Sequence, residues 1–223
     1  MLGLLLLASW SRNALESRGY QSAESNKLDA VLLGAGSERP EAGAFAVASV
    51  GAPAPGAANR ASRPAALGPG VLGRIEIPRL RIAAMVAEGV DMKTLGRAVG
   101  HITSTARPGS PGNCALAGHR DTFLRGLKGV RINDIIRVVT LDQTYTYRVE
   151  WGRVVEPYRV DVLDSTAIRS LTLITCYPFE FVGHAPRRFV VRARQVEAVS
   201  KIAFQSQGLT ARTARLAWSD GPR

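Results

Sequence analysis

The sequence predicts a mainly β domain, a closed barrel or a sandwich with short helices, that follows a helix and a flexible linker. From Val71 onward, short apolar and β-branched runs alternate with turn residues, which is the pattern of half-buried strands. These runs recur at regular spacing along the domain. Regularly spaced short strands favour a barrel or a sandwich over a doubly wound α/β fold.

The expected elements of this domain follow from the apolar runs and the turn residues that bound them. Two runs, 134–140 and 143–155, are close enough in sequence to form a hairpin. Asp91 precedes a short helical pattern and can cap it, and we interpret His101 as the end of a strand. The predicted elements are strands Val71–Ile77 and Ile82–Val86, helix Asp91–Ala98, and strands Ala115–Ala117, Asp134–Thr140, Gln143–Val155, Leu171–Thr175 and Arg188–Arg194.

Composition divides the chain into four parts. The first ten residues are apolar and end in Trp10, but a membrane-spanning helix needs ~20 such residues. We interpret them as the last part of a transmembrane helix that continues into an amphipathic helix over residues 11–33; a short buried N-terminal helix is the alternative. The four parts are a partial transmembrane anchor with a juxtamembrane helix (1–33), a Gly/Ala/Pro-rich linker (34–70), the β domain (71–199) and a polar C-terminal tail (200–223).

The chain is strongly basic, with a formal net charge of +11 and a pI near 10.6 over 223 residues. A nucleic-acid ligand, an anionic envelope surface and a generally basic proteome could each account for this charge. The Arg residues are scattered, and no run of five or more Lys and Arg occurs. This scatter argues against a dedicated nucleic-acid face, and the mean hydropathy of +0.01 argues against a polytopic membrane protein.

The chain has only two cysteines, Cys114 and Cys176, and three histidines. Two cysteines are too few for a disulfide framework or a Cys-rich zinc site. They could form one bridge, or one of them could be reactive. Cys114 lies an odd number of residues before His119, so in an uninterrupted strand the two side chains point to opposite faces. We therefore expect Cys114 to be a core residue.

Three segments carry groups suited to acyl transfer. His119 follows the run Leu116–Gly118, Cys176 ends a strand that Pro178 prevents from continuing, and Arg188 begins the last strand. A thiol with an ordinary pKa of ~8.5 needs a base to become a useful nucleophile, and a histidine can share its proton. A guanidinium cannot act as a base, but it can stabilise a developing oxyanion. The predicted catalytic residues are His119, Cys176 and Arg188.

These segments resemble the signature segments of the sortase family. The matching runs are Gly118-His-Arg-Asp121, Leu173-Ile-Thr-Cys-Tyr-Pro178 and Arg187-Arg-Phe-Val-Val191, and their order and spacing agree with the family. The turn at 108–113 and the stretch 127–134 resemble the class D type. The resemblance covers residues 71–196. In two respects the chain departs from the family: its anchor is incomplete, and Cys114 stands where an aliphatic residue is more usual.

The resemblance implies an eight-stranded sortase-type barrel and a cysteine transpeptidase. Such an enzyme cleaves a C-terminal LPxTx-type sorting signal, forms a thioacyl-enzyme and passes the protein to an amine of a cell-wall precursor or a pilin lysine. It implies a membrane-anchored enzyme with the catalytic domain outside the cytoplasm. We also expect a monomer and, from the scattered Arg residues, no nucleic-acid partner. Candidates for the substrate groove are Arg120, Thr175, Tyr177 and His184. We expect residues 1–70 to be dispensable for the chemistry.

We expect no cofactor and no metal. Some sortases use calcium through acidic loop clusters, but Glu156, Asp161 and Asp164 are spread apart in the 156–170 connection. A zinc site would need Cys114, His119, Cys176 and His184, which lack the close ligand pairs of structural zinc sites.

Three other functions are alternatives to this one, and the first is the weakest. An L,D-transpeptidase would carry a Ser-x-Gly-Cys segment close after a His-Gly pair, and this chain does not. A thiol peptidase would resolve the thioester with water. A non-catalytic, envelope-anchored binding barrel would leave the thiol idle, so a thiol-alkylating reagent would not affect its function.

Overall fold

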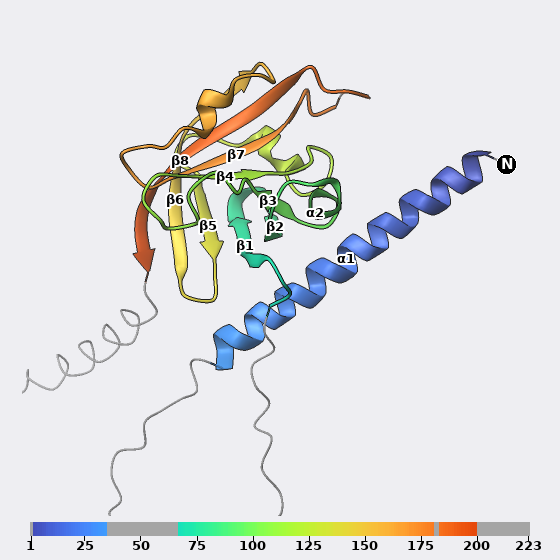
Figure 1. Cartoon of the computed structure of the whole chain (residues 1–223), viewed down its shortest axis with the longest axis horizontal. Coiled ribbons are helices and arrows are strands. Elements are labelled where there is room, and N and C mark those ends of the chain that lie inside the picture. Colours follow the sequence, from blue (N-terminus) through green and yellow to red (C-terminus); the bar gives the residue numbers. More distant parts are fainter. Residues whose placement is uncertain (1, 35–66, 181–182, 200–223) are drawn as a thin grey trace, which may run out of the picture.

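The computed structural model describes residues 2–34, 67–180 and 183–199 and contains a closed β-barrel with a long N-terminal helix (Figure 1). Around the barrel the strands follow the order β1-β2-β3-β4-β7-β8-β6-β5. Hydrogen bonds between β1 and β5 close it. The strands are β1 Val71–Ile77, β2 Ile82–Glu88, β3 Val99–His101, β4 Asn113–Ala117, β5 Ile135–Val139, β6 Thr144–Val155, β7 Ser170–Tyr177 and β8 Arg187–Val199.

Helical segments are few and mostly short. They are α1 Leu2–Gly34, α2 Met92–Arg97 and the 3₁₀ turns η1 Pro78–Leu80, η2 Arg125–Gly129 and η3 Val160–Leu163. Asp91 caps α2 as predicted, because its carboxylate accepts hydrogen bonds from the backbone N–H groups of Lys93 and Thr94. The mainly β barrel with short helices expected from the sequence is thereby confirmed.

Alternation along the strands fills the barrel with apolar side chains. In β1, Ile75 and Ile77 are fully buried, and in β7 Leu171 and Leu173 are fully buried against them in one core. The pairs β2–β3 and β4–β7 are parallel, and the other neighbouring pairs are antiparallel. Cys114 belongs to this core and is 1% exposed, which confirms its prediction as a core residue.

The observed strands differ from the predicted ones mainly in length. Strand β3 has three residues, too few to show alternation, and of these only His101 was assigned to a strand end. Strand β7 continues one residue past Cys176, because Tyr177 still pairs with Arg187 before Pro178 ends the ladder. The predicted tail 200–223 and the linker segment 35–66 lie outside the described residues.

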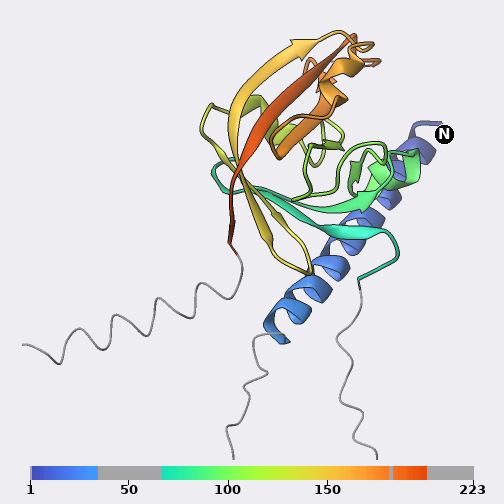
Figure 2. The same ribbon diagram turned by 60° about the vertical axis from the view of Figure 1, so that its left-hand side comes forward.

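Helix α1 runs unbroken from Leu2 to Gly34 and packs against the outside of the barrel with its C-terminal half (Figure 2). Leu28 is fully buried and contacts a small cluster that includes Met85 and Val139. Leu15, in the N-terminal half of the helix, is 66% exposed. Among the residues described here, no helix contains a stretch that is both long and apolar enough to cross a membrane.

Polar contacts fix the same half of the helix. Gln21 accepts a hydrogen bond from the Met85 backbone N–H and donates one to the Arg97 carbonyl. Glu24 accepts from the backbone N–H of Gly68 at 2.8 Å, and Arg74 of β1 donates to Asp29 at 3.0 Å. A chain beginning at Val71 would lack all of these contacts. The division into domains and the dispensability of residues 1–70 for chemistry stay predictions.

We expect Leu28→Ala to lower the free energy of unfolding by about 2–5 kcal/mol, because it leaves a cavity between α1 and the barrel. The matched control is Leu33→Ala on the same helix, where the leucine is 78% exposed and the change should stay within about 0.5 kcal/mol. Urea unfolding followed by circular dichroism measures both values. Equal effects of the two substitutions would show that α1 does not pack on the barrel in solution.

Candidate active site

Strand pairing brings Cys176 and Arg188 together. Cys176 is the penultimate residue of β7, and Arg188 lies directly opposite it on the antiparallel strand β8. Residues directly opposite each other in an antiparallel pair project to the same face of the sheet, so the thiol and the guanidinium share one face. Both side chains are half-buried. The thiol is therefore accessible and has a cation beside it.

The register of the parallel strands β4 and β7 positions His119. Ala117 pairs with Ile174, so His119 and Cys176, each two residues further on, lie at the same level of the barrel. The Gly118 N–H donates to the Ile174 carbonyl at 3.1 Å, which extends the ladder almost to the histidine. Cys176 thus has the His119 segment on one side and Arg188 on the other. The three residues predicted to be catalytic therefore come from the ends of three neighbouring strands.

The buried hydroxyl of Thr175 reinforces this arrangement. Thr175 is 2% exposed, and its Oγ1 donates to the Gly118 carbonyl at 2.7 Å. Alternation turns its side chain to the face opposite that of Cys176. Its observed contact is with the residue that precedes His119, so it holds the ends of the two strands together. A direct contact between Thr175 and substrate stays a prediction.

Arg120 is hydrogen-bonded to two positions of the loop 178–186 between β7 and β8, its first residue and its middle. Its guanidinium donates to the Pro178 carbonyl at 3.0 Å and to the Gly183 carbonyl at 2.9 Å. A second contact to this loop is the exposed ion pair between Lys128 and Glu180. The segment after His119 therefore holds the loop that separates Cys176 from Arg188. The observed partners of Arg120 are loop carbonyls, and its proposed place in the substrate groove stays a prediction.

The other two groove candidates lie in or beside the same loop. Tyr177 is half-buried, makes ring contacts with Phe179 and Phe189, and lies 5.5 Å beneath the Arg187 guanidinium. His184 is exposed. Arg188 itself donates to the Ala185 carbonyl at 3.2 Å. The loop therefore helps to orient the Arg188 guanidinium.

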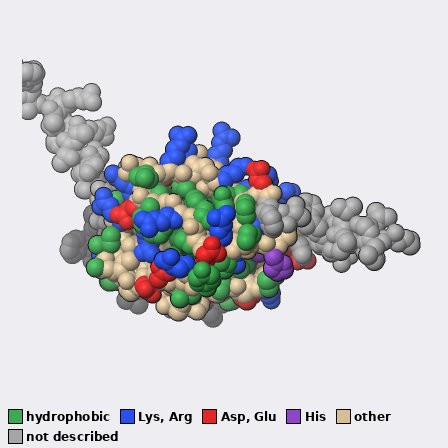
Figure 3. Space-filling view, turned by 90° about the horizontal axis from the view of Figure 1, so that it is seen from above, with side chains coloured by type: hydrophobic (Ala, Val, Ile, Leu, Met, Phe, Trp, Pro, Cys, Tyr) green, Lys and Arg blue, Asp and Glu red, His purple; other side chains and the backbone are tan. Residues whose placement is uncertain are grey.

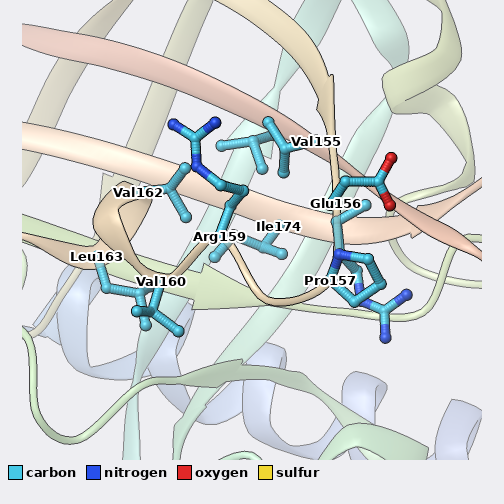
Figure 4. A pocket seen from close by; sticks show the side chains of 10 residues that line it. Val155, Glu156, Pro157, Arg159, Val160, Val162, Leu163 and Ile174 are labelled. Carbon is cyan, nitrogen blue, oxygen red and sulfur yellow. The ribbon is translucent and has the colours of Figure 1, made fainter.

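A pocket of about 120 Å³ lies next to this site, between the β6–β7 connection and the sheet (Figure 4). Its floor is Ile174 and Val190, a directly opposed pair one step before Cys176 and Arg188 on the same face. Two residues of strand span ~7 Å, so the pocket ends close to the thiol. The lining residues are Val155, Glu156, Pro157, Arg159, Val160, Val162, Leu163, Ile174, Arg188 and Val190.

The wall of this pocket is the part of the β6–β7 connection that lines it, within residues 156–163. Sequence reasoning did not identify this wall. The connection 156–170 was considered only for its acidic residues, of which Asp161 forms an exposed ion pair with Arg159. A signal was present, because Val160, Val162 and Leu163 form an apolar group inside a connection without strand periodicity. Together with Ile174 and Val190 these residues line the pocket, although Val160 is itself 68% exposed.

Cys114 is chemically separate from this site. It pairs with Leu171, five residues before Cys176, which places the two cysteines ~16 Å apart along the strand direction. Both are free thiols, and this separation excludes a bridge and a zinc site that uses both. Burial, with a smaller effect of Glu88, raises the pKa of the Cys114 thiol to about 12. Within the described ranges, no group of three or more His, Cys, Asp and Glu residues could hold a metal.

The family model for the sortase domain matches the sequence over residues 75–196, which include His119, Cys176 and Arg188. The chain belongs to the sortase family. The family expected from the three segments, and with it the sortase-type barrel, is confirmed.

Individual sortases resemble the chain over this same domain. Sortase D of Bacillus subtilis is 30% identical over 125 residues, which are 56% of this chain and 63% of the relative. Among solved structures, the Clostridium perfringens sortase D5 transpeptidase is 26% identical with a TM-score of 0.52, over 57% of this chain and 79% of that one. Sortase C-1 of Actinomyces oris is 31% identical with a TM-score of 0.53, over 57% and 75%. The chain thus matches somewhat less than two thirds of the B. subtilis relative.

We expect thiol reagents to distinguish the two cysteines of this sortase. With a pKa of about 12, on the order of one in 10⁴ Cys114 thiols is ionised at pH 8, and the side chain is buried. Iodoacetamide at pH 8 should therefore label one thiol per native chain, and peptide mass spectrometry should locate it at Cys176. The Cys176→Ala variant should react only after unfolding in urea. Rapid labelling of native Cys114 would contradict its buried position.

Proposed function

We propose that this sortase is a cysteine transpeptidase that cleaves an LPxTx-type sorting signal and transfers the cleaved protein to an amine of the cell envelope. The observation that carries the proposal is the position of Cys176, between the His119 segment and Arg188, which itself lines the neighbouring, mostly apolar pocket. The pocket suits the apolar part of such a signal. We infer that a signal bound in the pocket presents its next peptide bond to the thiol.

In the first half of the reaction, His119 takes the thiol proton and the Cys176 sulfur attacks the carbonyl carbon of the signal's threonine. Arg188 stabilises the negative charge that develops on the carbonyl oxygen. When the C–N bond breaks, His119 returns the proton to the departing amine. The product is a thioester between the threonine carbonyl and Cys176, and no redox partner is needed.

In the second half, an acceptor amine attacks the thioester after His119 removes its proton. The new amide forms, the C–S bond breaks and the Cys176 sulfur regains a proton. The proposed acceptor is an amine of a cell-wall precursor or a pilin lysine. Water in place of the amine would make the enzyme a thiol peptidase, which is the alternative outcome of the assay below.

The proposed location is the outer side of the cell membrane, with α1 leading from an N-terminal anchor. The net charge of +11 is compatible with an anionic envelope. On the side that is uppermost in Figure 1, basic side chains are interspersed with hydrophobic and acidic ones rather than gathered in one patch (Figure 3). That distribution suits a general attraction to an anionic surface better than a nucleic-acid site.

We expect Cys176→Ala to reduce cleavage of fluorescence-quenched LPxTx-type peptides to background, because the nucleophile is lost. The matched variant Cys114→Ala should retain most activity, since Cys114 is in the core and faces away from the site. Mass spectrometry should find the thioester only on Cys176. With hydroxylamine added as an amine acceptor, the product should be the hydroxamate. Turnover by purified Cys176→Ala would refute the mechanism, and an acid product alone would support the peptidase.

We expect Arg120→Ala to lower kcat for the same peptides by about tenfold or more, because the β7–β8 loop loses two hydrogen bonds to a charged donor. The kcat of Arg120→Lys should lie between those of Arg120→Ala and wild type, since an ammonium cannot reproduce the planar fork of donors. Arg137→Ala removes an equal charge from an exposed position on β5 and serves as the control. If Arg120→Ala behaves like Arg137→Ala, the loop does not depend on the guanidinium.

A further inference from the structure

Three successive residue pairs on the outer face of β7 and β8 lead toward the proposed nucleophile. Cys176 and Arg188 form the last pair, and Ile174 and Val190, the floor of the pocket, form the pair before it. The third pair is Thr172 and Arg192. Because alternate residues of a strand project to the same side, all three pairs face the β6–β7 connection. Thr172 and Arg192 form the one pair of the three that neither takes part in the proposed chemistry nor lines the pocket.

This third pair, together with Asn113 of β4, holds the wall of the pocket. The Asn113 side-chain amide donates to the Val162 carbonyl at 3.0 Å and to the Asp164 carbonyl at 3.2 Å. The Arg192 guanidinium donates to the same Val162 carbonyl at 2.9 Å. These carbonyls belong to the end of η3, where backbone acceptors have no partner within the turn.

The side chains that make these hydrogen bonds are buried or half-buried. Asn113 is 1% exposed and Thr172 is 0% exposed, and the Thr172 hydroxyl donates to the Asn113 side-chain oxygen at 2.6 Å. This bond orients the amide so that its two N–H donors face the wall. Arg192 lies 5.6 Å from the Trp151 ring, and burial lowers the pKa of its guanidinium from the ordinary value. A buried amide such as that of Asn113 is costly unless it is paired, so the loop position that pairs it is strongly favoured.

We propose that Asn113, Thr172 and Arg192 form an anchor that holds the pocket wall in its substrate-binding position before substrate arrives. The three are positioning residues, and none of them lines the pocket. They act through Val162, which lines the pocket. An anchored wall needs no ordering when the signal binds, so the anchor contributes to affinity for the apolar part of the signal rather than to acyl transfer. This inference rests on the proposed function.

The test uses full-length protein and two nearly isosteric changes. Asn113→Asp replaces the two N–H donors by acceptors that face carbonyls, and Thr172→Val removes the hydroxyl that orients the amide. Thr172→Ser keeps that hydroxyl. Asp91→Ala removes the cap of α2, outside the pocket lining, and controls for a general loss of stability.

Two readouts separate positioning from chemistry. Hydrogen exchange of the amides in 160–165 reports the wall directly, with the Asp164 N–H, bonded to the Asp161 carbonyl, as the reporter. Peptide cleavage gives KM and kcat, and iodoacetamide labelling reports the state of Cys176. In Asn113→Asp and Thr172→Val, the amides of 160–165 should exchange faster than in wild type, and KM should rise about tenfold. The kcat and the rate of Cys176 labelling should stay within about twofold of wild type. Thr172→Ser and Asp91→Ala should change neither exchange nor KM.

Unchanged exchange in both anchor variants would overturn the proposal, as would faster exchange with an unchanged KM. A fall of kcat and of the labelling rate that matches the rise of KM would also overturn it, because the three residues would then act on the site as a whole. If Asn113→Asp does not fold, Arg192→Lys tests the same carbonyl from a half-buried position. If wild type cleaves none of the peptides, the proposed function fails, and the exchange data still test the anchor.

Discussion

The hydrogen-bond register of β7 is the constraint on which the site depends. This strand lies between β4 and β8, and its pairing sets His119 level with Cys176 and Arg188 opposite it. A slip by one residue would turn the thiol into the core and bring a leucine to the surface. Leu171 and Leu173, both fully buried, oppose such a slip, and the Thr175 hydroxyl secures the end nearest the thiol. The core therefore positions the reacting groups.

The two faces of β7 have separate tasks. Leu171 and Leu173 on the inner face pack in the barrel, while the outer face presents a polar pair, an apolar pair and then Cys176 with Arg188. Because one ladder holds all three outer pairs, the distance from pocket to thiol is set by the strand itself. The segments that complete the site, the β6–β7 connection and the β7–β8 loop, are fixed through their carbonyls by Asn113, Arg192 and Arg120.

The groups proposed to carry the chemistry could be singled out from the sequence, because each stands where a strand begins or ends. Pro178 marks the end of β7, and Gly118 precedes His119. The strands other than β3 were predictable for a related reason, since burial on one face leaves a period of two in the sequence. Family resemblance supplied the number of strands and the pairing of His119 with Cys176, which periodicity alone does not contain.

What the sequence did not reveal depends on contacts between distant residues. Leu28 is buried because Met85 and Val139 lie beneath it, while Leu15 on the same helix stays exposed, and no local pattern separates the two. Asn113 looks like an ordinary residue after a glycine turn, yet its amide reaches carbonyls about fifty residues away. A side chain that bonds backbone carbonyls selects no particular residue type in its partner, so the partner segment carries no matching signal. Anchors of this kind become visible only when the fold brings strand and loop together.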